Sequence, residues 1–287
     1  MYVYIIKNSK KRSEAKQSVS TLVNNIEVKP PHRSTMSNSL TDIMTFYFTD
    51  EQLQSASDGD LVEGCLLLKS EQCSSSFQKR DDFRFVLAQR LTSVSGQMFA
   101  DCANLEGVSG ELVEEIADGA VKTVNQQTQL EGAFSGCHKL LQVSFPNLAR
   151  VGRGAFGSCT SLQEVSLQKC QTFGEAAFMH SGVKTILAPN LKEVGDFCFS
   201  GCGSLARVNF PQLVSLGEGA FERSGLEVLT APRLEQVGPS CFLHCLRVRA
   251  VRVRLGEGAF VCMKWGCKCP ICRQEMQACL DNREESE

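Results

Sequence analysis

Apolar positions recur through the middle of this 287-residue chain with a period of 21 or 22 residues. The period is marked by six phenylalanines: Phe134, Phe156, Phe178, Phe199, Phe221 and Phe242. An apolar residue followed by glycine stands five positions before most of them. A repeat of this length predicts a solenoid, in which each repeat forms one coil and neighbouring coils bury a continuous core.

Each repeat also contains a short phrase of alternating apolar residues. It reads Leu-x-x-Val-x-Leu/Phe and begins at Leu140, Leu162 and Leu205. Such alternation predicts a short strand with its apolar residues pointing inward. Stacked coils therefore predict a parallel sheet on one face, with short helical or 3-10 turns on the other. The recurring phenylalanine is expected to fill the core, one ring over the next.

The array extends beyond its regular centre. Phe99 lies 35 residues before Phe134, and we interpret this interval as one full step to Val121 followed by a coil shortened by nine. Phe77 lies a further 22 residues back, and Phe260 continues the pattern after a step of 18. This interpretation predicts about nine coils, where roughly three are enough for a stable stack.

Three regions follow from this pattern. Residues 1–60 form an N-terminal extension that is expected to be largely disordered, with a basic bias over residues 1–33 and a stretch rich in Ser, Thr and Asn up to Thr41. Apolar content returns from about residue 43, at Ile43–Phe48, and predicts a cap over the first coil. Residues 61–262 form the solenoid, and residues 263–287 form a Cys-rich C-terminal cap or tail.

The repeat phrase as a whole, Ile/Val-Gly-x-x-Ala-Phe-x-x-Cys-x-x-Leu-x-x-Val-x-Leu-Pro, resembles the BspA-type leucine-rich repeat. The resemblance covers roughly residues 77–262. It implies a leucine-rich-repeat solenoid and a protein-binding or cell-surface role, as in proteins of host-associated bacteria and parasitic protists. The first 60 residues, the region around Val121 and the tail depart from the pattern.

Charge and hydropathy exclude several classes of function. The net charge of −2 points to neither nucleic acid nor a membrane surface as a partner. No run approaches the ~18 apolar residues of a membrane span. The apolar run Tyr2–Ile6 precedes the first lysines, which is the reverse of a secretory signal. A cytoplasmic location is therefore expected, with a cell-surface or secreted one as the alternative that the resemblance implies.

The chain has 15 cysteines, and seven of them lie in phase with the repeat. Five follow the repeat phenylalanine by three residues, and Cys198 and Cys241 precede it by one. Because free cysteine packs as a small buried hydrophobe, a ladder of thiols in the core is predicted. Disulfides or bound metal are the alternative. The five members of the first phase are Cys102, Cys137, Cys159, Cys202 and Cys245.

The tail contains the only metal-like motif. Cys269-Pro-Ile-Cys272 resembles the last ligand pair of a RING finger, but a complete RING needs eight ligands and the chain does not supply them at suitable spacings. Free thiols and no cofactor are the expectation. A zinc-dependent regulatory protein is the competing hypothesis, with one zinc ion held by Cys262, Cys267, Cys269 and Cys272.

No nucleophile elbow, phosphate loop or paired carboxylates appear, so the chain is not expected to be an enzyme. A non-catalytic protein-binding module is predicted, with the outward positions of the strands as the contact surface. Four arginines at 247–254 favour an acidic protein partner, and a solvated sheet edge is the alternative reading. The candidate partner-binding residues are Arg207, Asn209, Glu227, Thr230, Arg249, Arg252 and Arg254.

Overall fold

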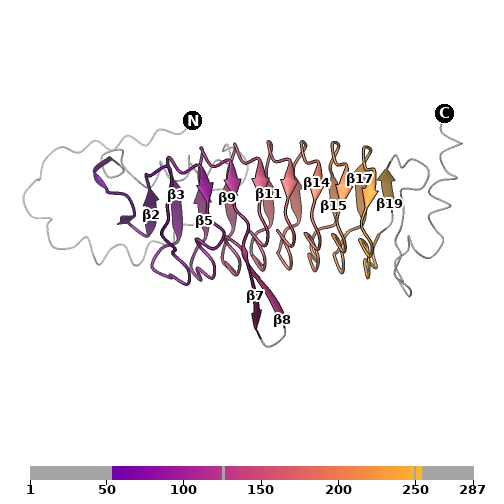
Figure 1. Cartoon of the computed structure of the whole chain (residues 1–287), viewed down its shortest axis with the longest axis horizontal. Coiled ribbons are helices and arrows are strands. Elements are labelled where there is room, and N and C mark those ends of the chain that lie inside the picture. The colour runs from indigo at the N-terminus through magenta and orange to yellow at the C-terminus, as the bar shows by residue number, and fades with distance from the viewer. Residues whose placement is uncertain (1–53, 125–126, 249, 254–287) are drawn as a thin grey trace, which may run out of the picture. The chain divides into compact units, whose positions relative to one another are not determined.

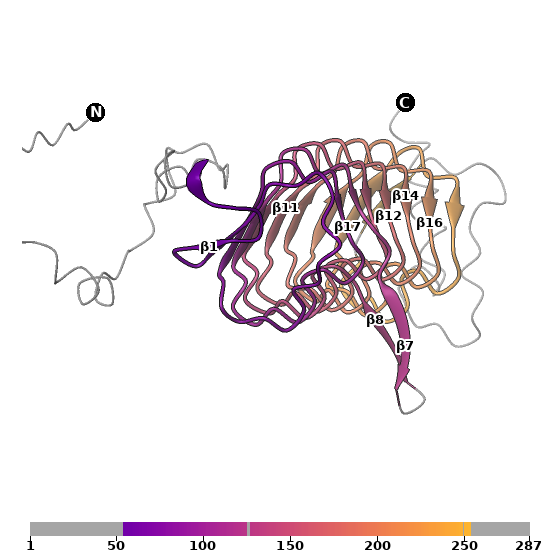
Figure 2. The same ribbon diagram turned by 60° about the vertical axis from the view of Figure 1, so that its left-hand side comes forward.

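The structure, a computed structural model, describes residues 54–124, 127–248 and 250–253. These residues form a stack of coils in which two parallel ladders of strands enclose the core (Figures 1 and 2). The leucine-rich-repeat solenoid expected from the sequence is therefore confirmed. The predictions that fall on residues 1–53, on Phe260 and on the Cys-rich tail lie outside the described residues.

The first ladder, here called the strand face, is built from the predicted Leu-x-x-Val-x-Leu phrases. The strands fall into three sheets, and within each sheet neighbouring strands pair in parallel and in register, for example Val165 with Ile186. The members of this ladder are β2 (Cys65–Leu68), β3 (Phe85–Ala88), β5 (Gly107–Ser109), β9 (Gln142–Ser144), β11 (Glu164–Ser166), β13 (Thr185–Leu187), β15 (Arg207–Asn209), β17 (Val228–Ala231) and β19 (Ala250–Val253). Strand pairing is interrupted between β9 and β11 and between β13 and β15.

A second parallel ladder joins the two-residue strands that precede each phenylalanine corner. The apolar member of each strand, such as Val151 or Val194, points into the core. The ladder is a seven-stranded sheet of β4 (Ser93–Val94), β6 (Glu115–Ile116), β10 (Arg150–Val151), β12 (Thr172–Phe173), β14 (Glu193–Val194), β16 (Ser215–Leu216) and β18 (Gln236–Val237).

The phenylalanine rings form a continuous stack between the ladders. Phe134, Phe156 and Phe178 lie with neighbouring ring centroids 5.3 Å apart and nearly parallel planes. The same arrangement runs from Phe77 to Phe242, with centroid distances of 5.2–5.9 Å between successive coils. The predicted core role of these rings is confirmed.

The corner that carries each phenylalanine is a series of hydrogen-bonded turns, where short helical or 3-10 turns were expected. The Phe134 N–H donates to the Ala155 carbonyl of the next coil at 2.8 Å, and Phe156 N–H donates to Ala177 at 2.7 Å. A helix needs these donors for carbonyls within its own coil. Because they bond between coils instead, the corner does not become helical.

The interval between Phe99 and Phe134 corrects the sequence interpretation. The two rings stack directly, with centroids 5.3 Å apart, so no separate coil exists at Val121. Instead an antiparallel hairpin, β7 (Ala120–Val124) and β8 (Gln127–Glu131), leaves the coil after β6 and returns before Phe134. Figures 1 and 2 show it projecting from the stack. Ile116, five residues before Val121, was expected to hold the apolar position that precedes a corner. It does so, because it pairs in register with Val151, which holds that position in the next coil.

At the N-terminal end of the strand face, β1 (Leu61–Val62) pairs antiparallel with β2. Gly59 N–H donates to the Leu67 carbonyl at 2.7 Å, and Leu67 N–H donates to Asp60 at 3.0 Å. These bonds use backbone groups of β2 that a first strand would otherwise present to solvent.

Candidate functional site

The central part of the strand face exposes two side chains from each strand. In β11, β13 and β15 the middle residue is buried and the residues on either side of it are exposed. The pleat of a strand places these flanking residues on one surface. That surface carries both polar and apolar groups, because Leu187 of β13 is 49% exposed beside polar neighbours.

The structure brings four of the candidate partner-binding residues together. Arg207 and Asn209 are exposed on β15, and Asn209 is in register with Thr230 of β17. Thr230 and Glu227 are half-buried. Thr230 is also in register with Arg252 of β19, whose side chain lies outside the described part, as do Arg249 and Arg254. Arg247, at the start of this cluster, is exposed.

The N-terminal part of the same face differs from the sequence expectation. Alternation in the sequence predicts that Leu87 of β3 and Ser109 of β5 point outward into solvent. In the structure Leu87 is 9% exposed and Ser109 is 0% exposed. Leu87 packs in a second, smaller apolar cluster with Cys65 and Leu67. The alternation of the strand is correct, but this end of the face is covered.

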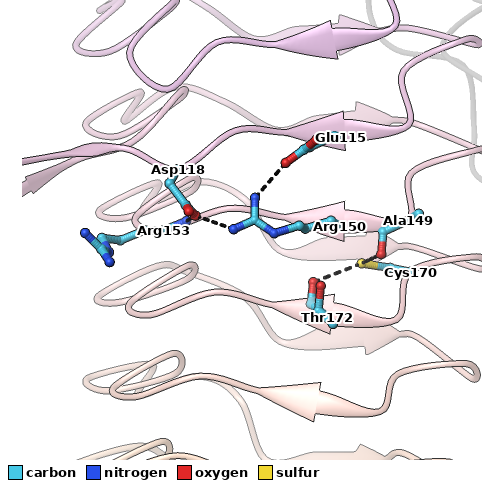
Figure 3. A network of polar contacts seen from close by, with 7 residues as sticks. All are labelled: Glu115, Asp118, Ala149, Arg150, Arg153, Cys170 and Thr172. Carbon is cyan, nitrogen blue, oxygen red and sulfur yellow. Dashed lines mark hydrogen bonds and ion pairs between the residues drawn. The ribbon is translucent and has the colours of Figure 1, made fainter.

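The second ladder carries a polar network that the sequence did not reveal (Figure 3). The Arg150 guanidinium contacts Glu115 and Asp118, each at 2.7 Å, and Asp118 also accepts a hydrogen bond from the Arg153 backbone N–H at 2.8 Å. The repeat phase hides the pairing, because the hairpin separates Glu115 from Arg150 by 35 residues. The network lies beside the point where the hairpin leaves the stack.

Asp118 illustrates the electrostatics of this network. Burial raises the pKa of its carboxyl group, but hydrogen bonds from the Arg153 N–H and the Arg150 guanidinium lower it, and the pKa lies below its ordinary value. The carboxylate is therefore charged throughout the neutral pH range and holds Arg150 in place. Ion pairs this exposed contribute little stability, ~0–1 kcal/mol each, so we interpret the network as a positioning element.

The predicted thiol ladder is confirmed. The five in-phase cysteines are buried, and each thiol donates to the carbonyl of the preceding coil's phenylalanine. For example, Cys159 Sγ lies 3.1 Å from the Phe134 oxygen and Cys202 Sγ lies 3.0 Å from the Phe178 oxygen. In the two shorter coils a serine takes this place, and Ser181 Oγ lies 3.4 Å from Cys202 Sγ.

These thiols are expected to resist alkylation in the folded protein. Burial raises the pKa of Cys102 and of Cys202 to about 11, and a thiolate is the reactive form. Iodoacetamide at pH 8, followed by peptide mapping, should modify Cys73, which is half-buried, well before either of them. In denaturant all three should react alike. Rapid native modification of Cys102 or Cys202 would contradict the ladder.

The described residues contain neither a cluster suited to a metal ion nor a helix suited to a membrane span. Within residues 54–124, 127–248 and 250–253, no group of three or more His, Cys, Asp or Glu side chains is arranged to hold a metal ion. The zinc candidates Cys262, Cys267, Cys269 and Cys272 lie outside these ranges. None of the helical segments in the described ranges has the length and apolar character needed to cross a bilayer.

Comparison with protein families agrees with the geometry of the coils. The model of the BspA type leucine rich repeat region matches residues 127–249 in six copies. These residues are therefore similar to a BspA-type leucine-rich repeat region. The match begins inside the hairpin and runs through the coils that carry the exposed part of the strand face. No curated protein matches the chain.

Several solved structures are similar to this chain. A leucine-rich repeat protein of T. pallidum is 23% identical over 66% of this chain and 86% of its own, with a TM-score of 0.49. A leucine-rich cell surface protein of Faecalibacterium prausnitzii is 17% identical over 64% of each chain, with a TM-score of 0.35. The pneumococcal vaccine antigen PcpA is 14% identical over 66% of this chain and 50% of its own, with a TM-score of 0.37.

Proposed function

We propose that this chain is a non-catalytic protein-binding module that contacts its partner through the strand face from β11 to β17. The observation that carries the proposal is the exposure of two side chains per strand in β11, β13 and β15 on a hydrogen-bonded, fully packed scaffold. A surface fixed in this way loses little conformational entropy on binding.

The chemistry of the face suggests how a partner is held. Leu187 supplies an exposed apolar contact, and Arg207 and Asn209 supply polar contacts in the next coil along the stack. A standard interface buries about 800 Å² on each partner, more than three short strands provide. The contact therefore includes the neighbouring positions Lys184 and Glu227 at the entry to their strands.

An acidic partner fits the C-terminal end of this surface. Arg207 and Arg247 are exposed there, and the sequence adds Arg249, Arg252 and Arg254 within the next coil. Clustered positive charge accelerates association with an acidic surface, and it is screened within about 8 Å at physiological salt. A partner of this kind binds the central face through apolar and polar contacts and is attracted by the arginine end.

Two substitutions on the face test the proposal after a partner has been captured with the full chain. Leu187→Asp should weaken partner affinity at least about tenfold, since it places an unpaired charge in the contact, and Arg207→Ser should slow association mainly at low salt. Biosensor kinetics at two salt concentrations would measure both effects. Neither variant should shift the melting temperature appreciably.

Matched variants away from the face serve as controls. Leu112 is 48% exposed in the turn after β5, and Lys192 is exposed beside the second ladder. Leu112→Asp repeats the leucine-to-aspartate change, and Lys192→Ser removes one positive charge as Arg207→Ser does. Both control variants should leave binding unchanged. If the control variants weaken binding as much as the face variants, or if the face variants have no effect, the partner binds elsewhere.

A further inference from the structure

The outward side of the strand face is closed at one end and open from β11 onward. Leu87 of β3 and Leu187 of β13 hold the same third position of their strands, yet Leu87 is 9% exposed and Leu187 is 49% exposed. Outward residues Cys65 and Leu67 of β2 are fully buried as well. The difference lies in what covers the two ends, because the backbone geometry is shared.

Residues from before β2 contribute to this cover. Ala56 and Val62 pack against the cluster of Cys65, Leu67 and Leu87 at the first two strands. Ser109 of β5 lies one strand further along and is 0% exposed as well. The three residues of β9 beyond it are all half-buried. The cover therefore extends across β5 and reaches β9.

The chain itself supplies a suitable occupant. The described part begins at residue 54, immediately before β1 at the closed end of the face (Figure 2). The eleven residues before it reach up to ~36 Å when extended, whereas each strand adds ~4.8 Å to the sheet, so they are long enough to cross to β9. Met44, Phe46 and Phe48 alternate with Thr45 and Tyr47.

We infer that residues 43–53 lie across the outward side of β2, β3, β5 and β9 and occupy that part of the strand face. The apolar residues Met44, Phe46 and Phe48 match the apolar outward groups Leu67 and Leu87, against which Ala56 and Val62 also pack. This contact limits the surface that a protein partner reaches to the strands from β11 onward. The inference does not depend on the proposed function, because it concerns a contact within the chain.

Hydroxyl-radical footprinting of the full chain tests it with Leu87 and Leu187 as a matched pair. In the wild-type protein Leu87 should be oxidised about fivefold more slowly than Leu187, in proportion to their exposures of 9% and 49%. In the variant Phe46→Asp/Phe48→Asp, Leu87 oxidation should rise to about that of Leu187. Burying two carboxylates in an apolar contact is unfavourable, so residues 43–53 should detach from the strand face. Oxidation of the core residue Leu162, which is 0% exposed, should stay low in the variant and would show that the array itself is intact.

A control and a second measurement keep the result interpretable. Leu22→Asp/Val23→Asp makes the same kind of change outside residues 43–53 and should leave Leu87 protected. A benzophenone group attached at Ser144→Cys on β9, in an otherwise wild-type chain, should cross-link to residues 43–53 on illumination. This cross-link does not require the aspartate variant to fold.

Three outcomes would overturn the inference. Equal oxidation of Leu87 and Leu187 in the wild-type chain would mean that nothing covers Leu87 in solution. Leu87 protection that persists in the Phe46→Asp/Phe48→Asp variant, with cross-links only to residues 54–62, would assign the cover to that segment. Protection that rises with protein concentration would assign the cover to a second copy of the chain.

Discussion

Replacing Phe156 by alanine is expected to lower the free energy of unfolding by about 3–5 kcal/mol, and Phe199→Ala should do the same. Phe156 is fully buried between the rings of Phe134 and Phe178, with both centroids at 5.3 Å. Its removal leaves a void that neighbouring coils cannot close without breaking the hydrogen bonds that fix their spacing. Chemical denaturation of the wild-type and variant chains measures the difference.

Phe197 provides the matched control, since the chemical change is the same but the ring is half-buried and lies outside the phenylalanine stack. Phe197→Ala should cost less than half as much as Phe156→Ala. Equal losses at the two positions would mean that the stack has no special role, and a Phe156→Ala variant as stable as the wild type would contradict the core assignment.

Gly182→Ala is expected to destabilise the array by about 3 kcal/mol through overpacking. Gly182 forms the shortened corner Ser181-Gly182-Val183 of a 21-residue coil, and a Cβ atom there would lie less than 3.0 Å from the Thr160 carbonyl of the preceding coil. Gly225 holds the equivalent corner against Gly203. Because the atom in the way belongs to the backbone, a side-chain rotation cannot relieve the clash.

Gly203→Ala is the corresponding control. No atom lies within 4 Å of the position that its Cβ would take, and Gly203 is exposed. Thermal melts should therefore place Gly203→Ala close to the wild type and Gly182→Ala well below it. If Gly182→Ala melts with the control, the two coils are not as closely spaced at this corner as the structure shows.

The period of the sequence was sufficient to predict the coils, the stacked rings and the thiol ladder, because each depends on one residue type that returns at one phase. The hairpin was not predicted, since its insertion breaks the phase and Val121 matches an apolar repeat position by chance. The second ladder was missed for another reason. Its strands are two residues long, and one apolar residue such as Val151 followed by Gly152 indicates a turn as readily as a strand.

The candidate site was predicted only where the repeat alone decides exposure. Arg207 and Asn209 point outward and are exposed, as the alternation of β15 requires. Leu87 and Ser109 also point outward, but they are buried, and Ala56 and Val62 from before β2 pack against the cluster that contains Leu87. Alternation within a strand determines direction and carries no information on what lies above the sheet.

The hairpin also shows where this scaffold accepts additional sequence. Phe99 and Phe134 stack at 5.3 Å across the insertion, the same distance as Phe134 and Phe156 across an uninterrupted corner. The coil therefore opens between a second-ladder strand and the next phenylalanine without disturbing its neighbours. The same corner recurs after β10, β12, β14, β16 and β18. Peptide epitopes or binding loops grafted there would be displayed at intervals of one coil along a single edge, so the array is a natural frame for multivalent display.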